Sequence, residues 1–179
     1  MVEINKWLHS YDFNYSYFLN NYVNKIIDLY NNNPLKEKDF AFDLNYLPLN
    51  NFLLPKLNKI VEENYYIGKK YTEGKISIYV QEPNEKEEKQ SYLHNHAHTL
   101  GNICGVFYLN IPQDGGEFHV YNPPFIDQVI KPQIDKIYLF PNWLMHRAIS
   151  HKGDKKRICF NWWYGGNIRP IHKLTGQLW

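Results

Sequence analysis

Apolar residues recur at helical spacing in two stretches of the first third of the chain. In residues 15–30 they fall three or four positions apart, and a run of asparagines followed by a proline ends the pattern. A second apolar stripe covers residues 53–61, where Asn50 or Asn51 is placed to act as the N-cap and Pro55 fits only near the first turn. The pattern predicts two helices, each with an apolar face that a sheet must cover.

After Gly68 the pattern changes to short runs of β-branched and aromatic residues separated by Pro, Gly, Asn and Asp. These runs predict eight strands, near residues 75–81, 91–99, 103–111, 117–121, 128–131, 136–140, 146–150 and 157–164. Eight short strands are typical of a jelly-roll barrel, also called a double-stranded β-helix. We therefore predict a mainly β fold in which N-terminal helices support a jelly-roll barrel.

The length of 179 residues is enough for one barrel with a few helices packed against it. We expect a single domain, 1–179, with a mainly helical N-terminal part at 1–68, a jelly-roll core at 69–166 and a C-terminal tail at 167–179. The 15 Tyr, 10 Phe and 5 Trp residues agree with this prediction, because aromatic side chains favour strands and large cores.

Charge and hydropathy narrow the function classes. The chain has 20 Lys and Arg against 18 Asp and Glu, and these residues are interspersed, so it lacks the basic stripe that nucleic-acid binding requires. Its start has no basic segment followed by an apolar run, and no stretch is apolar over the length that spans a bilayer. We therefore expect a soluble, cytoplasmic protein with neither nucleic acid nor a membrane as its partner.

Three histidines, His94, His96 and His98, alternate with two other residues in a strand-like stretch, so all three imidazoles point to one face. Burying three imidazoles is costly unless something coordinates them, and the stretch therefore predicts a metal site. A single strand supplies only one edge of a coordination polyhedron, and His146 is the best candidate for a further ligand. The histidines expected at the surface are His9, His151 and His172. We also expect His119 on the solvent side of its strand, because its neighbours Phe118 and Val120 form the expected core face, and a place in the pocket as a substrate contact is the alternative.

Arg157 is the first residue of an otherwise apolar predicted strand, RICFNWWY. A guanidinium buried there would need a bidentate anion as its partner. Alternation puts Cys159, Asn161 and Trp163 on the face of Arg157. A pocket with an arginine at its floor and a metal at its rim is suited to hold a small oxoacid.

The stretches HAHTLGNICGVFYLNIPQDGGEFHVYNPP, YLFPNWLMHRAIS and RICFNWW follow one another along the chain. Together they resemble the iron(II)- and 2-oxoglutarate-dependent oxygenase superfamily, in particular a small phage and bacterial branch with an H-x-H, SGVYYL, GG and FPSWLxH pattern. The resemblance covers residues 75–164. It implies a jelly-roll fold, the cofactors Fe(II), 2-oxoglutarate and O2, a small-molecule cosubstrate, and a dioxygenase of the hydroxylase type; it names no primary substrate.

The resemblance also implies which residues hold the metal. The first ligand pair of the superfamily falls on the histidine-rich stretch, where the distance back from Gly105 favours His96 and His98. His94 with His96 is the alternative pair. The distal ligand of the superfamily falls on His146.

Roles in binding 2-oxoglutarate follow from the same resemblance. Arg157 matches the arginine that binds the far carboxylate of 2-oxoglutarate, and Tyr108 matches a tyrosine that hydrogen-bonds this carboxylate. Trp163 matches an aromatic residue of the pocket wall. Gly115 and Gly116 match a turn before the next barrel strand, where positive φ angles are commonly required.

The chain departs from the usual superfamily pattern at one ligand. The usual triad is two histidines and a carboxylate, but this chain has His where the Asp or Glu would stand, and Asp114 and Glu117 come only after the next strand. Two alternatives therefore stay open: a cupin-like three-histidine dioxygenase that does not use 2-oxoglutarate, and a non-enzymatic jelly-roll metal-binding or virion module. Arg157 favours the 2-oxoglutarate enzyme, because the three-histidine dioxygenase has no general need for it.

Overall fold

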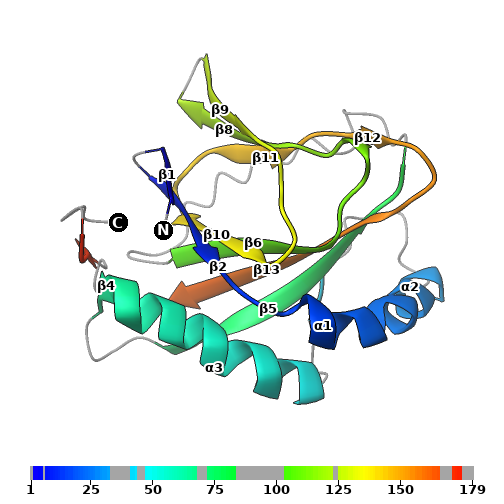
Figure 1. Ribbon diagram of the computed structural model, residues 1–179, viewed down its shortest axis with the longest axis horizontal. Helices are drawn as coiled ribbons and strands as arrows, with labels where there is room; N and C mark the ends of the chain where they lie inside the picture. The colour runs from blue at the N-terminus through cyan, green and yellow to red at the C-terminus, as the bar shows by residue number, and fades with distance from the viewer. Residues whose placement is uncertain are drawn as a thin grey trace.

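The computed structural model describes residues 2–5, 7–32, 41–43, 47–67, 72–83, 103–122, 125–165 and 171–174 (Figure 1). Its helices are α1 (Ser16–Leu19), the 3-10 helix η1 (Asn20–Tyr22), α2 (Val23–Asn31) and α3 (Leu47–Asn64). Its strands are β1 (Val2–Asn5), β2 (Leu8–Asp12), β3 (Ala41–Asp43), β4 (Tyr65–Tyr66), β5 (Thr72–Gln81), β6 (Ile103–Asn110), β7 (Asp114–Gly115), β8 (Phe118–Asn122), β9 (Phe125–Ile130), β10 (Lys136–Pro141), β11 (His146–Ala148), β12 (His151–Lys152), β13 (Arg157–Gly165) and β14 (Ile171–His172). The described chain is mainly β with helices near its N-terminus, which confirms the predicted fold class.

Seven strands form one antiparallel sheet, here called the major sheet, in the order β1-β2-β10-β6-β13-β5-β3. The minor sheet has three strands in the order β11-β8-β9, and two short pairs, β12-β7 and β14-β4, lie beside them. Figure 1 shows α3 along one side of the major sheet and the minor sheet on its other side. The two sheets therefore face each other as the two walls of a jelly roll.

Buried apolar side chains lie on both faces of the major sheet. The outer cluster joins the sheet to the helices and includes Leu53 and Leu57 of α3 with Phe160 and Trp162 of β13. Period-two alternation along β13 sends Phe160 and Trp162 outward and Cys159 inward, as the sequence predicted. The inner cluster joins the major sheet to the minor sheet and consists of Leu8, Val106, Tyr108, Phe118, Val120, Ile130, Tyr138, Phe140, Leu144 and Cys159.

Both predicted helices are present with different bounds. Residues 15–30 form α1, η1 and α2 in succession, and α3 begins at Leu47, so the prediction of Asn50 or Asn51 as its N-cap is wrong. Pro55 lies in the interior of α3, where its missing N–H costs about 3 kcal/mol. Burial of the apolar stripe against the major sheet offsets this cost. The buried side chains of the helix are Leu49, Leu53, Leu57 and Val61.

The described residues of the N-terminal part form four strands, β1 to β4, that the mainly helical prediction for residues 1–68 did not include. β2 pairs with β10 in the major sheet, from Lys136↔Asp12 to Leu139↔His9. Leu8 belongs to the inner cluster and Tyr11 to the outer cluster, so β2 follows the same alternation as its neighbours. The segment LHSYD is short and mixes polar with aromatic residues, which left the alternation too weak to read from the sequence.

Three histidines that were expected at the surface are buried instead: His9 and His172 are 0% exposed and His151 is 1% exposed. On the outer face, His9 Nδ1 lies 3.3 Å from Tyr65 Oη, Tyr11 Oη lies 3.0 Å from His172 Nε2, and the two imidazole centroids are 4.2 Å apart. These contacts join β2, β4 and β14, which lie far apart in the sequence. A local pattern therefore could not predict their burial.

We expect the stability of the fold to decrease as the pH falls below about 6.5. Burial, and to a lesser extent the charge of His172, lowers the pKa of His9 from 6.5 to about 4. The unfolded chain therefore takes up the proton first, and the stability present above pH 6.5 is lost as the pH falls toward 4. The loss amounts to about 3 kcal/mol.

Urea unfolding at a series of pH values between 7 and 4 measures this loss. In His9→Gln the free energy of unfolding should depend much less on pH over the same interval, because the variant has no imidazole at this position. An equally steep dependence in the wild type and in His9→Gln would show that other groups cause it.

Asp135 connects the turn between β9 and β10 to the segment that enters α1. Its Oδ1 accepts hydrogen bonds from the backbone N–H groups of Tyr15 at 2.9 Å and Ser16 at 2.8 Å, and its Oδ2 accepts one from Ser16 Oγ at 2.6 Å. Its backbone carbonyl accepts a further bond from Phe13 N at 2.8 Å. Asp135 has a φ of 59°, in the left-handed region that Asp and Asn tolerate better than other residues with a side chain.

Asp135→Ala should lower the free energy of unfolding by about 2 kcal/mol, because two backbone N–H groups lose their acceptor and alanine is strained at positive φ. Asp135→Asn keeps one side-chain oxygen and tolerates this backbone, so it should lose less than half as much. Chemical denaturation of both variants measures the difference. Identical midpoints for the wild type and Asp135→Ala would show that these hydrogen bonds add no net stability.

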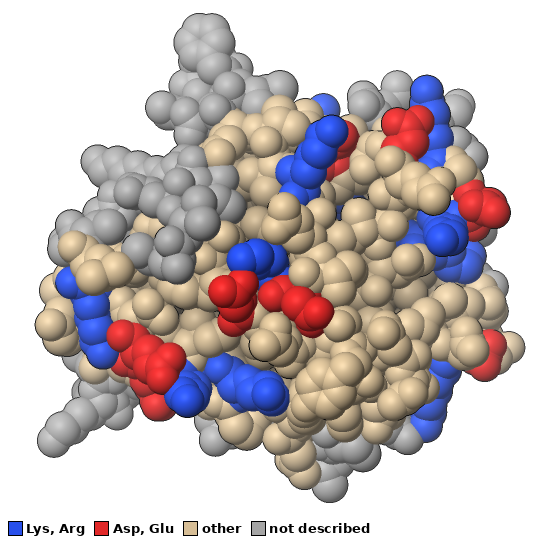
Figure 2. Space-filling model, in the orientation of Figure 1, with Lys and Arg blue, Asp and Glu red and all other residues tan. Residues whose placement is uncertain are grey.

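Charged side chains of both signs lie close together on the face drawn in Figure 2. Ion pairs of the surface include Lys136 with Asp12, at 2.5 Å between Nζ and Oδ1, and Lys59 with Glu63, at 3.6 Å between Nζ and Oε1. Exposed pairs of this kind add little to stability, about 0 to 1 kcal/mol each. Within the described ranges, no helix combines the length and the apolar composition needed to cross a lipid bilayer.

Candidate functional site

Only one of the predicted metal ligands falls in the described part of the chain. His94, His96 and His98 lie outside the described residues, and His146 lies within them. Among the residues that the structure describes, no group of three or more His, Cys, Asp or Glu side chains could hold a metal ion. His146 is therefore the predicted ligand whose geometry can be compared with that of a metal-binding histidine.

His146 begins β11, and its ring packs against two aromatic side chains of the inner cluster. The ring centroid lies 5.1 Å from that of Phe118 and 4.6 Å from that of Phe140. Its Nδ1 lies 2.8 Å from the carbonyl oxygen of Leu144. A carbonyl oxygen only accepts, so Nδ1 carries the proton and Nε2 keeps its lone pair. An imidazole whose proximal nitrogen is held by a backbone carbonyl is the usual form of a metal-ligating histidine, so His146 fits a metal.

Arg157 begins β13 and is only 5% exposed. Its Nη1 donates to the carbonyl oxygen of Gly116 at 3.3 Å, while its Nε is buried and has no hydrogen-bond acceptor among the described residues. A buried guanidinium with an unused N–H is costly unless an anion completes its hydrogen bonds. The planar fork of an arginine matches a carboxylate, so this position fits a carboxylate group.

Tyr108 shares the inner face of the major sheet with Arg157. It is 1% exposed, and its partner across the strands is Cys159, two residues from Arg157. Burial raises the pKa of Tyr108, and the charge of Arg157 opposes this rise. The phenol therefore keeps its proton at neutral pH and is able to donate a hydrogen bond. The structure thus brings together two of the three residues that were predicted to bind the cosubstrate.

Trp163, the third of these residues, lies elsewhere. It is on β13 opposite Cys104 of β6, six residues from Arg157 along the same strand, and it is 37% exposed. Trp163 therefore does not lie beside Arg157 but toward the other end of β13.

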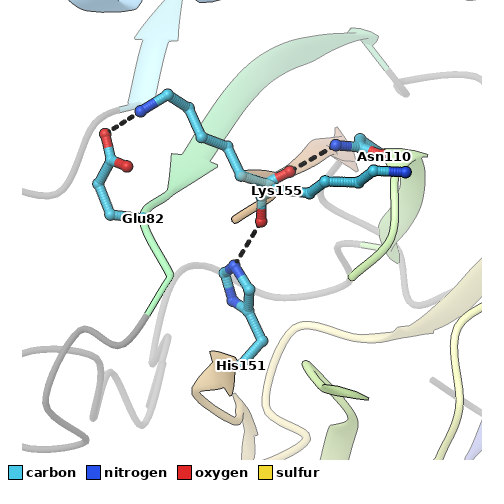
Figure 3. Close-up of polar contacts among 5 residues, drawn as sticks. Glu82, Asn110, His151 and Lys155 are labelled. Atoms are coloured by element: carbon cyan, nitrogen blue, oxygen red, sulfur yellow. Dashed lines mark hydrogen bonds and ion pairs between the residues drawn. The ribbon is translucent and has the colours of Figure 1, made fainter. Parts of the chain in front are cut away.

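The loop before Arg157 is held from three sides (Figure 3). His151 Nε2 lies 3.0 Å from the carbonyl oxygen of Lys155, and Asn110 Nδ2 donates to the carbonyl oxygen of Lys156 at 2.7 Å. The side chain of Lys156 forms an ion pair with Glu82. These partners come from β12, from the end of β6 and from just after β5. Together they fix the position of Arg157, the first residue of β13.

Gly115 and Gly116 form a turn that lies against Arg157. Their φ angles are 81° and 77°, which confirms the predicted need for positive φ. A Cβ atom on Gly115 would lie 2.5 Å from the carbonyl oxygen of Ser150, and one on Gly116 would lie 2.8 Å from Cγ of Pro112. Both positions therefore exclude a side chain, and the close approach of this turn to β12 and Arg157 requires glycine.

Two glutamines that the sequence analysis did not single out face the same interior. Gln81 is the cross-strand partner of Arg157, and Gln128 pairs with Val120, which in turn pairs with His146. Cross-strand partners share a face, and in each glutamine Oε1 is buried without a donor in the described part of the chain. Gln128 is in phase with the buried Ile130, so strand alternation could have placed it inward from the sequence.

Comparison with known proteins gives matches of fold. No family model and no curated protein matches the chain in sequence. The chain is similar to the viral collagen prolyl hydroxylase of Paramecium Bursaria Chlorella virus-1 in its 2-oxoglutarate complex, with a TM-score of 0.57, 15% identity, and 89% of this chain and 96% of that chain covered.

Two further solved structures show the same similarity. The prolyl-4-hydroxylase of Pseudomonas putida matches with a TM-score of 0.56 and 13% identity, covering 88% of this chain and 91% of that chain. HygX of Streptomyces hygroscopicus, solved with nickel and 2-oxoglutarate bound, matches with a TM-score of 0.50 and 12% identity, covering 89% and 82%. The chain therefore has the jelly-roll fold of these members of the 2-oxoglutarate and iron(II) oxygenase family.

Proposed function

We propose that this chain is an Fe(II)- and 2-oxoglutarate-dependent dioxygenase of the hydroxylase type. The observation that carries the proposal is the buried Arg157, whose Nε lacks an acceptor in the described residues and which lies next to Tyr108. A jelly-roll module without a small anionic ligand would gain nothing from this arrangement. The likeness in fold to proteins solved with 2-oxoglutarate supports the same function.

In this proposal His146 holds the metal through Nε2, together with His96 and His98, and His94 with His96 is the alternative pair. When bound, Fe(II) with 2-oxoglutarate and O2 supplies the oxidation of a substrate C–H bond coupled to decarboxylation of the cosubstrate. The bond from His146 Nδ1 to Leu144 fixes the orientation of the imidazole and keeps the proton away from the ligating nitrogen.

Arg157 and Tyr108 bind the far carboxylate of 2-oxoglutarate and so set its position relative to His146. Arg157 supplies a charge-assisted pair of N–H donors, and the protonated phenol of Tyr108 supplies a third donor. Buried apolar side chains of the inner cluster, such as Val106 and Phe140, exclude water from this interior. Trp163 forms part of the wall near the opposite end of the inner face.

Turnover of 2-oxoglutarate tests the proposal. Protein loaded with Fe(II) in the presence of O2 should convert 2-oxoglutarate slowly to succinate, and the rate should increase when a substrate is present. Because the structural neighbours include prolyl hydroxylases, proline-containing peptides are the first substrates to try. Full iron binding without any succinate would favour the three-histidine dioxygenase, and zinc binding without iron would favour the metal-binding module.

A further inference from the structure

We propose that Tyr15 is a positioning residue for the cosubstrate pocket that acts through the backbone of Tyr108, an inference that rests on the function proposed above. Tyr15 Oη donates a hydrogen bond to the carbonyl oxygen of Tyr108 at 2.5 Å and accepts one from its N–H at 3.1 Å. One hydroxyl group therefore makes both hydrogen bonds that a paired strand would make with Tyr108.

Strand pairing alone fixes Tyr108 weakly. On one side of β6, the ladder with β10 extends only as far as the pair Ile137↔Phe107 and does not reach Tyr108. On the other side, the register with β13 shifts, so that Cys159 is opposite Tyr108 while Ile158 is opposite Asn110. Tyr108 thus lies at a bulge and just beyond the end of a ladder, where the backbone needs another partner.

Tyr15 is held firmly enough to act as that partner. Its side chain is 0% exposed, and its ring centroid lies 5.1 Å from those of Phe13 and Phe107. Its backbone N–H donates to the carboxylate of Asp135 at 2.9 Å. A series of contacts therefore runs from Asp135 through Tyr15 to Tyr108, and it ends at a side chain that faces Arg157 and the interior.

Tyr15→Phe removes the hydroxyl while it keeps the ring packing. The backbone N–H and carbonyl of Tyr108 would then be buried without these bonds, and the phenol of Tyr108 would lose its fixed position. We expect the dissociation constant for 2-oxoglutarate to increase about tenfold, as for the loss of one well-placed hydrogen bond. Metal binding should not change, because Tyr15 lies outside the proposed ligand set.

The experiment is a double-mutant cycle measured by calorimetric titration of 2-oxoglutarate into the Mn(II)-loaded protein without O2. The proteins are the wild type, Tyr15→Phe, Tyr108→Phe and the double variant. If Tyr15 acts through Tyr108, Tyr15→Phe should weaken binding about tenfold in the wild-type background and less than about twofold in the Tyr108→Phe background. Ile78→Val, which removes a methyl group from the outer cluster, is a destabilised control that should bind 2-oxoglutarate as the wild type does.

Several results would overturn the inference. If the wild type binds 2-oxoglutarate and Tyr15→Phe binds it equally well, Tyr15 has no positioning role, and the proposed function still stands. An equal loss in both backgrounds would mean that Tyr15 does not act through Tyr108. A wild type that does not bind 2-oxoglutarate would overturn the inference and the proposed function together. If Tyr15→Phe does not fold, Asp135→Ala decides, because it removes the acceptor of the Tyr15 N–H and leaves the hydroxyl of Tyr15 in place. An unchanged dissociation constant for 2-oxoglutarate in that variant would also remove the positioning role.

Discussion

Arg157→Ala should abolish measurable binding of 2-oxoglutarate and leave the metal content unchanged. Arg157 is buried, and its Nε has no acceptor in the described residues, so a bound carboxylate would make its main charged contact here. Removing one member of a buried charged pair costs about 3 to 5 kcal/mol, which corresponds to a dissociation constant at least about 100-fold higher. Calorimetric titration measures the binding, and metal analysis of the same sample measures the content.

Two controls make the result for Arg157 specific. Arg157→Lys keeps the charge but loses the planar fork, so its affinity should lie between those of the wild type and Arg157→Ala. Lys155→Ala removes an exposed cation from the loop that precedes β13, and it should bind as the wild type does. Unchanged affinity in Arg157→Ala would mean that the far carboxylate binds elsewhere or that 2-oxoglutarate is not a ligand.

His146→Ala should lose bound iron. Nδ1 of His146 donates to the carbonyl oxygen of Leu144, so Nε2 carries no proton and has the form of a metal ligand. Changing a group that only orients a ligand weakens metal binding roughly 10 to 100-fold, and removing the ligand itself should weaken it more. Equilibrium dialysis against Fe(II) without O2, followed by metal analysis, gives the stoichiometry. Full metal content in the variant would place the distal ligand elsewhere.

His119→Ala is the matched control for His146→Ala. His119 lies on β8 directly opposite Arg147, while its neighbours Phe118 and Val120 belong to the inner cluster, as the sequence predicted. Its imidazole is therefore on the other face of the minor sheet from His146. The variant should keep its iron, and loss of iron in both variants would point to unfolding of the minor sheet and not to a missing ligand.

The sequence predicted those features that depend on local alternation and on ordered motifs. Along β13, the pattern RICFNWWY correctly separated Cys159 from Phe160 and Trp162. The paired glycines of the turn, Gly115 and Gly116, indicated positive φ angles that the structure has. The side-chain alternation and the positive φ angles both depend on a few neighbouring residues, so the sequence alone is enough to predict them.

Contacts between distant segments could not be predicted in this way. His9 and His172 look like surface residues near the ends of the chain, and they are buried only because β2 and β14 both lie against Tyr65. The bonds from Tyr15 to Tyr108 join residues 93 positions apart. Tertiary packing also outweighed a local rule in α3, where Pro55 is accepted inside a helix.

The proposed function requires that 2-oxoglutarate bind iron(II) in the interior between His146 and Arg157. The most direct measurement is a titration of the anaerobic Fe(II)-loaded protein with 2-oxoglutarate, followed by visible absorption. We expect a weak charge-transfer band that grows and saturates, is absent in Arg157→Ala at the same concentration, and is also absent in His146→Ala. Iron binding without any such band in the wild type would contradict the proposed function.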